Sequence, residues 1–347
     1  HPVAPIPASA LLSAVMVKVG LLGWIRFLPL GDESVIVLAQ PMLILGFTGA
    51  FFAAIYGALQ DNPKAVLAYS TVSQLGIIVA SIGFALAFPG DWEMLLPAIV
   101  FFAMHHGFAK ATLFFCVGID SELKPGSRFA PYLWLLILIP ALSLIGIPLS
   151  SGALAKVSLK SATTNLPLFS ILLVLSAIGT TLLMCRFIEL MRQQAAGSAS
   201  NATLRWGLIL PTSLSAMMCI GYLYTTPSFE FKSFEAITST LNWSALWPVI
   251  LGVSLMLASS KLRSRIPVPA AGDLLIAYRE VARLLHKFIQ YTMGLFIKIV
   301  RDINILIDRS KATSLPISIR PGKELAIEAP GAVVIGILGV LLYAFLI

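Results

Sequence analysis

The feature that most limits how this chain can fold is its repeated runs of about 18 or more largely apolar residues, each long enough to cross the ~30 Å hydrocarbon core of a bilayer as a helix. Helices in soluble proteins are seldom apolar on all sides. Of the 347 residues, 58% are hydrophobic and only 12% are charged. These values exclude a soluble globular enzyme, a disordered chain and a nucleic-acid-binding domain. We therefore expect an all-α fold, a polytopic bundle of transmembrane helices.

The predicted spans cover residues 6–30, 34–59, 64–88, 92–118, 166–190, 204–224, 243–260 and 331–347. Lys and Arg concentrate in the cytoplasmic loops of membrane proteins. Loops with acidic residues begin at Asp32 and Asp91, and loops with basic residues begin at Lys124 and Lys261. The two kinds of loop alternate along the chain only if the remaining apolar stretch, residues 131–165, crosses the membrane once.

This stretch is too long for one straight span, and its middle holds the heptapeptide Gly146-Ile-Pro-Leu-Ser-Ser-Gly152. Proline removes a backbone donor and clashes with the preceding turn, and glycine supplies the freedom to bend. We expect a discontinuous helix that unwinds near residues 148–152, followed by a second helix with Lys156 and Lys160. Broken helices line ion paths in transporters, so we expect a hydrated pocket with Lys156 at its edge. The alternative is a simple helical hairpin at the membrane edge.

Residues 273–311 follow a different pattern, with apolar residues at three-four spacing and basic residues mostly on the opposite face. This predicts a lateral amphipathic helix that lies along the basic side of the membrane. It is either an anchor on the lipid surface or a brace across neighbouring helices or a neighbouring subunit. The predicted organisation is a transmembrane bundle over residues 1–265, a surface helix with its linker over residues 266–329, and a final transmembrane helix over residues 330–347.

Four lysines lie inside apolar runs, where a charged lysine costs roughly 3 kcal/mol at the bilayer centre; they are Lys18, Lys110, Lys156 and Lys160. The amine of Lys160, near a helix end, can reach the membrane surface, whereas Lys18 and Lys110 lie deep in their spans. His106 and Lys110 are four residues apart and share a helix face. Because imidazole titrates near neutrality, this pair can hold or pass a proton, unless the histidine is only hydrogen-bonded to a neighbour. No Asp or Glu lies deep in any predicted span.

Four motifs occur in order: HPVAPIPASALLSAVMVK at 1–18, DNPKAVLAYSTVSQLG at 61–76, HGFAKATLF at 106–114 and GIPLSSGALAK at 146–156. With these motifs the chain closely resembles the antiporter-like subunits of respiratory complex I, of Mrp-type sodium/proton antiporters and of proton-pumping membrane-bound hydrogenases. The resemblance covers most of residues 1–190 and weakens beyond them.

The resemblance implies roles in proton transfer for the residues that match its motifs. Lys18 resembles the central proton-storing lysine of the family, and His106 and Lys110 resemble the relay that connects it onward. Lys156 resembles the terminal lysine on the second half of the broken helix. The resemblance therefore implies a path of buried Lys and His side chains joined by water.

The chain also departs from the family pattern. Ser13 occupies a place where many complex I members have His and where the hydrogenase and Mrp branches often have Ser. Phe102 stands where many members place an additional His. The family has an N-terminal half ahead of the segment that begins at His1, and we expect a partner subunit to supply it. Alternatively, that half preceded His1 in a longer chain, or this chain does not pump alone.

The resulting first hypothesis is a proton-translocating membrane subunit of a redox-driven respiratory complex, of the membrane-bound hydrogenase or complex I type. Two alternatives remain open: an Mrp-type sodium/proton antiporter subunit, and a structural half-module without transport of its own. The three cysteines are far apart and form no C-x-x-C motif, so we expect no metal or cofactor in this chain, and iron–sulfur or other metal centres in partner subunits. The expected partners are membrane-arm subunits, a peripheral redox arm and lipids, and the expected location is the inner cell membrane.

Overall fold

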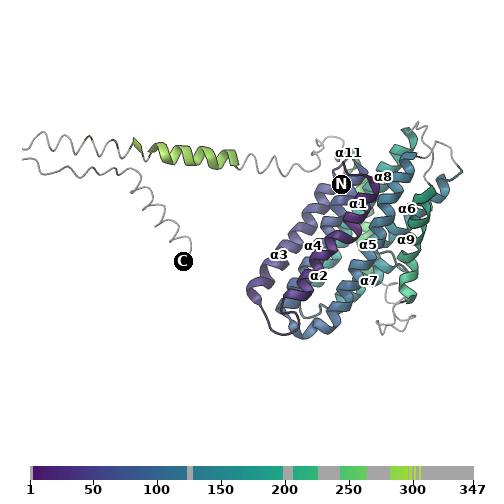
Figure 1. The fold of residues 1–347 in the computed structure, drawn as a ribbon, viewed down its shortest axis with the longest axis horizontal. Helices are drawn as coiled ribbons and strands as arrows, with labels where there is room; N and C mark the ends of the chain where they lie inside the picture. Colours follow the sequence, from purple (N-terminus) through teal and green to yellow (C-terminus); the bar gives the residue numbers. More distant parts are fainter. Residues whose placement is uncertain are drawn as a thin grey trace, which may run out of the picture. The chain divides into compact units, whose positions relative to one another are not determined.

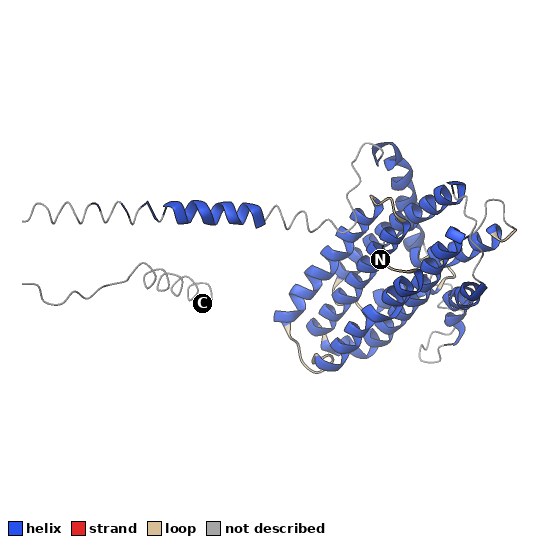
Figure 2. Cartoon of the chain, turned by 45° about the horizontal axis from the view of Figure 1, so that its top comes forward, coloured by secondary structure: helices blue, strands red, loops and turns tan. Residues whose placement is uncertain are grey.

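The computed structural model describes residues 3–122, 128–197, 206–225, 243–263, 282–295, 297–298, 301 and 305. Two compact units divide the chain, His1–Asp273 and Leu274–Ile347. All regular structure in the described residues is helical, with no strand among them (Figure 2). The predicted all-α fold is confirmed. The proposed limits of the surface helix and of the final span fall largely on residues outside the described ranges and stay predictions.

The first unit is a bundle of long helices (Figure 1). Its first span is continuous over α1 (Ile6–Leu11), a π-helix (Leu12–Met16) and α2 (Val17–Phe27). The other helices are α3 (Ile36–Ala58), α4 (Pro63–Ala87), α5 (Trp92–Glu122), α6 (Ala130–Ile145), α7 (Ser151–Ser161), α8 (Pro167–Gly197), α9 (Trp206–Thr225) and α11 (Trp243–Arg263).

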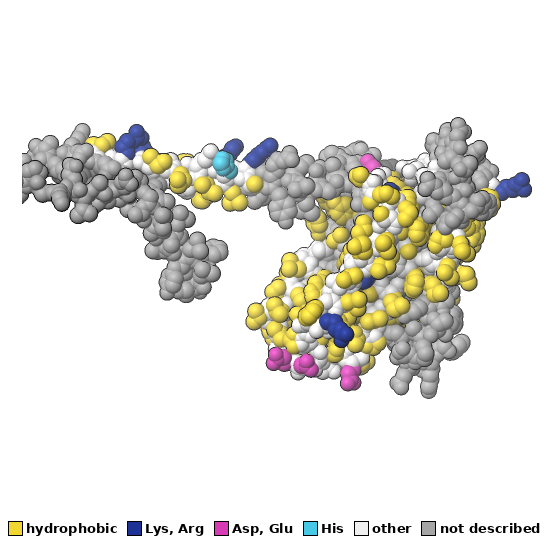
Figure 3. Space-filling view, viewed as in Figure 1, with side chains coloured by type: hydrophobic (Ala, Val, Ile, Leu, Met, Phe, Trp, Pro, Cys, Tyr) yellow, Lys and Arg dark blue, Asp and Glu magenta, His cyan; other side chains and the backbone are white. Residues whose placement is uncertain are grey.

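Among the described helices, five are long and apolar enough to cross a membrane: Ile6–Phe27, Ile36–Ala58, Pro63–Ala87, Pro89–Ser121 and Pro167–Gln194. Three shorter apolar segments, Ala130–Ile145, Ile209–Cys219 and Ala245–Ser259, accompany them. Hydrophobic side chains cover most of the visible face of the bundle, and acidic side chains gather at its lower end (Figure 3). Soluble proteins rarely expose so much contiguous apolar surface, so the chain is a polytopic membrane protein.

Hydrogen bonds between distant segments define the two ends of the bundle. At one end, Lys64 Nζ donates to the carbonyl of Ala4 (2.8 Å) and Arg186 Nη2 pairs with Asp61 Oδ1 (2.7 Å). At the other end, Asn165 Nδ2 donates to Asp91 Oδ2 (2.7 Å).

These contacts decide how often residues 131–165 cross. α5 starts at the Asp91 end, and Gly118 in its last turns contacts Ile6, which lies near Ala4 at the opposite end. α6 starts soon after α5 ends, and residue 165, which follows α7, is back beside Asp91. α6 and α7 therefore cross the bundle once, as the loop charges predict, and the hairpin alternative is wrong.

Two buried apolar clusters fill the bundle, and a polar layer separates them. On α4, Val66 and Leu67 belong to one cluster and Ile77 and Ile78 to the other. The buried polar residues between the clusters are Ser70, Thr71, Ser73 and Gln74 of α4, His105 and His106 of α5, and Ser176, Thr180 and Thr181 of α8. We call this set the polar layer. Gln74 Nε2 donates to Thr180 Oγ1 across it (2.8 Å).

The second unit contains a helix over residues 282–295, whose side chains are all exposed. Leu285, Phe288 and Ile289 are among its apolar residues, and Arg283 and Lys287 among its basic ones. This helix agrees with the central part of the predicted amphipathic segment. The rest of that segment and the predicted span at 331–347 lie almost entirely outside the described residues.

α3 and α4 approach so closely that a side chain at Gly46 has no space. A Cβ added there would lie 2.5 Å from the amide nitrogen of Ala80 and 2.6 Å from the carbonyl oxygen of Gly76. We expect Gly46→Leu to lower the free energy of unfolding by about 1–3 kcal/mol, because it forces the two helices apart. Denaturant titration of the detergent-solubilised protein measures this change. The matched control is Gly49→Leu in the same helix, where an added Cβ meets no atom within 4 Å; equal losses in both variants would contradict the prediction.

Candidate proton-transfer site

Lys18 follows a π-helical turn in the first span. A π-helix widens the backbone, and such turns are frequent at functional sites. The amine of Lys18 reaches back to the carbonyl of Ser13 (2.5 Å). The side chain is half-buried and lines an apolar groove of about 670 Å³ between the first span, α5 and α9. The sequence predicts a buried Lys18 that faces the interior of the bundle; the side chain is half-buried because the described helices leave this groove uncovered.

Hydrogen bonds tie the first span and α5 to the same turns of α4. Ser13 Oγ and Thr71 Oγ1 are 2.7 Å apart, and Thr71 Oγ1 donates to the carbonyl of Leu67 (3.0 Å). The same carbonyl accepts a hydrogen bond from Lys110 Nζ (2.9 Å), and Lys110 is fully buried. Since a buried amine is costly unless it is hydrogen-bonded, the Leu67 carbonyl is what permits Lys110 at this depth. The sequence did not single out Thr71, although a polar residue in an apolar helix was the signal available.

His106 is also fully buried, and neither of its ring nitrogens has a hydrogen-bond partner within the described part of the chain. Lys18 and Lys110 are both close enough to act electrostatically on it. His106 therefore lies in the protein interior, and it does not face lipid. A buried imidazole with both nitrogens unpaired is a group to which water or a proton can bind.

The helix break lies at Gly146–Ser150, slightly earlier than the predicted residues 148–152. α6 ends because Gly146 adopts a left-handed conformation (φ +90°), and Leu149 also has a positive φ (+69°). Ser150 caps α7: its hydroxyl accepts from the amide of Ala153 (3.3 Å) and donates to the carbonyl of Ile147 (2.6 Å). The predicted discontinuity is thus confirmed, with the left-handed glycine as its starting point.

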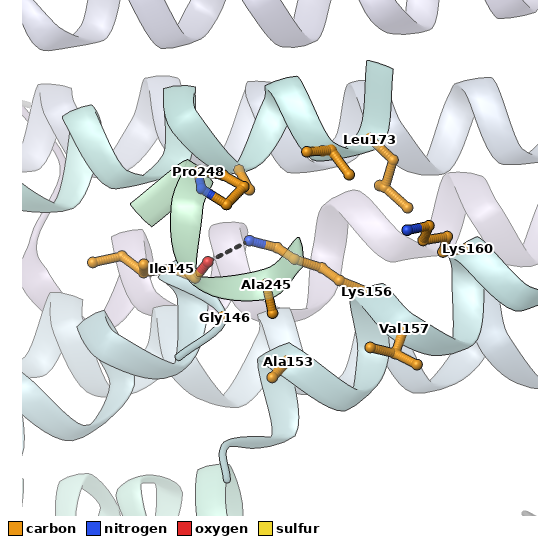
Figure 4. A pocket seen from close by; sticks show the side chains of 11 residues that line it. Ile145, Gly146, Ala153, Lys156, Val157, Lys160, Leu173, Ala245 and Pro248 are labelled. Atoms are coloured by element: carbon orange, nitrogen blue, oxygen red, sulfur yellow. Dashed lines mark hydrogen bonds between the residues drawn. The ribbon is translucent and has the colours of Figure 1, made fainter. Parts of the chain in front are cut away.

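Lys156, in the helix after the break, binds the end of the helix before it. The last carbonyls of a helix have no partner within the helix, and Lys156 Nζ donates to those of Ile145 (2.7 Å) and Leu144 (3.1 Å). Figure 4 shows Lys156 extending from α7 back to the end of α6, with Lys160 further along α7. Both lysines line a cavity of about 70 Å³ between α7, α8 and α11. The sequence predicts a pocket with Lys156 at its edge, and the structure adds that carbonyls of α6 also bind its amine.

His105, beside the predicted His106, contacts the break directly. Its Nδ1 lies 2.9 Å from Ser151 Oγ, which in turn lies 3.1 Å from Ser143 Oγ. Ser151 also donates to the carbonyl of Cys219 in α9. The sequence did not single out His105, because successive helical residues point about 100° apart and only the tertiary fold decides which neighbour each one meets.

Asp120 is an acidic residue that is buried near the end of a span and not deep within it. The fourth span was predicted to end at residue 118, but α5 continues to Glu122. Asp120 is only 6% exposed, and its Oδ2 has no hydrogen-bond partner among the described residues. Residues 119–122 continue α5 as a helix, and the side chain of Asp120 is buried against the bundle.

The transmembrane family described as NADH:quinone oxidoreductase/Mrp antiporter, TM matches residues 1–183. The chain belongs to this family. The matched region contains Lys18, His106, Lys110 and Lys156 together with the helix break. The chain is thus an antiporter-like membrane subunit of the complex I and Mrp family.

Individual relatives agree with this membership. A Staphylococcus saprophyticus protein named as antiporter subunit mnhA2 is 35% identical over 202 residues, covering 51% of this chain and 25% of that protein. NADH-quinone oxidoreductase subunit L of Neisseria meningitidis is 33% identical over 169 residues, covering 46% of this chain and 24% of the relative. The chain matches about a quarter of the length of these relatives. In the Mrp complex of Dietzia, a subunit has the same fold over 98% of this chain and 41% of its own (TM-score 0.60, 21% identity).

Gly152 is the position on which the geometry of the break depends most. A Cβ added there would clash with the carbonyl of Ser143 and lie 2.9 Å from His105 Nε2. We expect Gly152→Ala to reduce the free energy of unfolding by about 1–3 kcal/mol by separating α6 from α7. Gly23→Ala in α2 is the matched control, since no atom lies within 4 Å of its added Cβ. Thermal melting of the two purified variants compares them, and an unchanged melting temperature for Gly152→Ala would disprove the clash.

Proposed function

We propose that the chain is a proton-translocating subunit of a redox-driven respiratory complex, of the membrane-bound hydrogenase or complex I type. The observation that carries the proposal is that the spans of one bundle hold three lysine amines with backbone carbonyl partners, Lys18, Lys110 and Lys156, together with the fully buried imidazole of His106. Buried ionisable groups in membrane spans are costly and mark ion or proton paths, and a scaffold has no need of three such amines.

In this mechanism Lys18 stores a proton, the His106 and Lys110 pair connects it onward, and Lys156 exchanges it at the break. Each amine has backbone carbonyls as hydrogen-bond acceptors, and these stabilise the protonated form. Two ammonium groups in a medium of low dielectric constant repel one another, so protonation of one favours release from the next. Water completes the gaps between the groups, as it does between other polar groups separated by more than about 3.5 Å.

The driving chemistry takes place in partner subunits. We infer that iron–sulfur or other metal centres there supply redox energy, and that neighbouring membrane-arm subunits, in the inner cell membrane, transmit it. The assembly of the similar Dietzia subunit in an Mrp complex supports multi-subunit partners.

An Mrp-type sodium/proton antiporter subunit is the second candidate. The similarity to a relative named as an antiporter subunit and to a subunit of an Mrp complex favours it. The two candidates share the proton path but differ in the driving force. In membrane vesicles with a pH-sensitive dye, addition of NADH or hydrogen drives proton movement in the first case, and a sodium pulse without an electron donor drives it in the second.

Lys18→Ala tests the proposed path. We expect proton movement in these vesicles to fall at least about tenfold, because positioned proton transfer contributes about 10²–10⁴-fold. Copurification of the partner subunits verifies that the complex still assembles. Wild-type proton movement in an assembled Lys18→Ala complex would refute a role for Lys18 and favour a purely structural module.

Lys156 and Lys160 form a matched pair on the same helix and at the same cavity. Only Lys156 binds the free carbonyls of α6, whereas Lys160 is exposed. We expect Lys156→Ala to reduce proton release at least about tenfold and Lys160→Ala to leave it within twofold of wild type. Release is followed with the dye on the side to which protons are delivered, and the reverse ranking would show that Lys160 is the exchanging group.

A further inference from the structure

His105 forms a hydrogen-bond network that none of the roles above includes. The ring is buried in α5 (3% exposed), and its Nδ1 contacts Ser151 at the first turn of α7. Ser151 contacts Ser143 in α6 and the carbonyl of Cys219 in α9. One imidazole therefore contacts the start of α7, and through Ser151 connects to α6 and α9.

The network fixes the protonation pattern of the ring. A serine hydroxyl has one hydrogen and two lone pairs, and Ser151 uses its hydrogen on the Cys219 carbonyl, which can only accept. Its lone pairs must then accept from Ser143 and from His105, so Nδ1 of His105 carries the hydrogen. The amide of Gly152 donates to Ser143 Oγ (3.3 Å), which is consistent with this direction. In the neutral ring Nε2 is left as the free base, an assignment that follows from the hydrogen-bond pattern.

The free nitrogen Nε2 points at the break. A Cβ on Gly152 would lie 2.9 Å from it, so this nitrogen faces the backbone at the start of α7. Lys18 and Lys156 both act electrostatically on the ring. On α5, His106 precedes Lys110 by one helical turn and follows His105 directly. His105 therefore shares α5 with this pair, and its base nitrogen faces the start of α7, the helix that carries Lys156.

We propose that His105 is a proton-carrying residue that transfers protons between the α5 pair and Lys156. Nε2 accepts a proton from the ammonium of Lys110, by way of His106 and water, and the ring becomes an imidazolium. The same N–H bond then breaks, and the proton passes through water in the break to the neutral amine of Lys156, which becomes an ammonium. Nδ1 keeps its hydrogen on Ser151 throughout, so the ring need not rotate.

The repulsion between charged groups gives the transfer its direction. An imidazolium at His105 and an ammonium at Lys156 are disfavoured together, so His105 is charged only while Lys156 is neutral. The role of Ser151 is positional: it holds the tautomer whose base nitrogen faces the break. This inference rests on the proposed proton path and adds the group that connects its two halves.

The test separates a proton carrier from a structural bridge by two substitutions at the same position. His105→Asn places an amide N–H close to the position of Nδ1 and can keep the bond to Ser151, but it cannot carry a proton. His105→Leu removes both properties. The assay is proton flux into proteoliposomes that contain the whole purified complex and an enclosed pH dye, after an acid jump with valinomycin and potassium. This assay requires no knowledge of the natural driving reaction.

We expect both variants to reduce flux at least about tenfold in the assembled complex. Ser151→Ala should reduce flux several-fold, because without the Ser151 hydroxyl the ring hydrogen of His105 is no longer held on Nδ1. Ser158→Ala is its matched control in α7, since among the described residues the Ser158 hydroxyl bonds only the Leu154 carbonyl of its own helix (2.9 Å), and it should stay within twofold of wild type. Flux within twofold of wild type in His105→Asn would overturn the proposal and leave His105 a structural bridge. If His105→Asn does not assemble, Ser151→Ala decides instead, and flux within twofold of wild type in that variant would overturn the proposal.

Lys18→Ala in the same assay distinguishes a failure of the His105 role from a failure of the proposed function. Low flux in Lys18→Ala with wild-type flux in His105→Asn would reject the role of His105 and leave the proposed function standing. Wild-type flux in both variants would reject the proposed function itself.

Discussion

The absence of water from the hydrocarbon core is the constraint on which the rest of this structure depends, because every backbone polar group there needs a partner and a buried amine is costly without one. Three lysine amines meet that condition in the same way, by donating to backbone carbonyls. Lys18 uses Ser13, Lys110 uses Leu67, and Lys156 uses Ile145. The carbonyls of Ser13 and Ile145 are available because the backbone departs from a regular α-helix there, as a π-turn or as a helix end. At Ser13 and Ile145, the irregular backbone therefore supplies the acceptor that the lysine amine needs.

The polar layer has the same origin. Between the two apolar clusters, Gln74 of α4 bonds Thr180 of α8, and Thr71 and Thr180 bond carbonyls of their own helices. The break between α6 and α7 connects to this layer through the bond from His105 to Ser151. Non-helical backbone is tolerated at membrane depth only where protein or water surrounds it, and here the side chains of Ser150 and Lys156 bind the freed carbonyls.

The proposed function follows from how these groups are joined rather than from their identity alone. One connection holds the first span and α5 to α4 through Ser13, Thr71 and the Leu67 carbonyl, and the other runs from His105 to the break. Neither connection follows consecutive residues, and each depends on helices that are distant in the sequence. His106 lies between them with both ring nitrogens unpaired among the described residues. Proton transfer between the two connections therefore requires groups that change charge, and His105 and His106 are the candidates.

Apolar run length determined the number and approximate limits of most described helices, because a bilayer of fixed thickness selects segments of fixed length. Loop charges, with the Gly-Pro…Gly heptapeptide, determined that residues 131–165 cross once through a broken helix. The lysines and His106 were predictable because ionisable residues in apolar runs are rare and conspicuous. What only the tertiary structure decided were the partners: Thr71 for Ser13, Ser151 for His105, the Ile145 carbonyl for Lys156, and the burial of Asp120. These contacts depend on how each helix is rotated about its axis and packed against its neighbours. The length of an apolar run in the sequence does not determine that rotation.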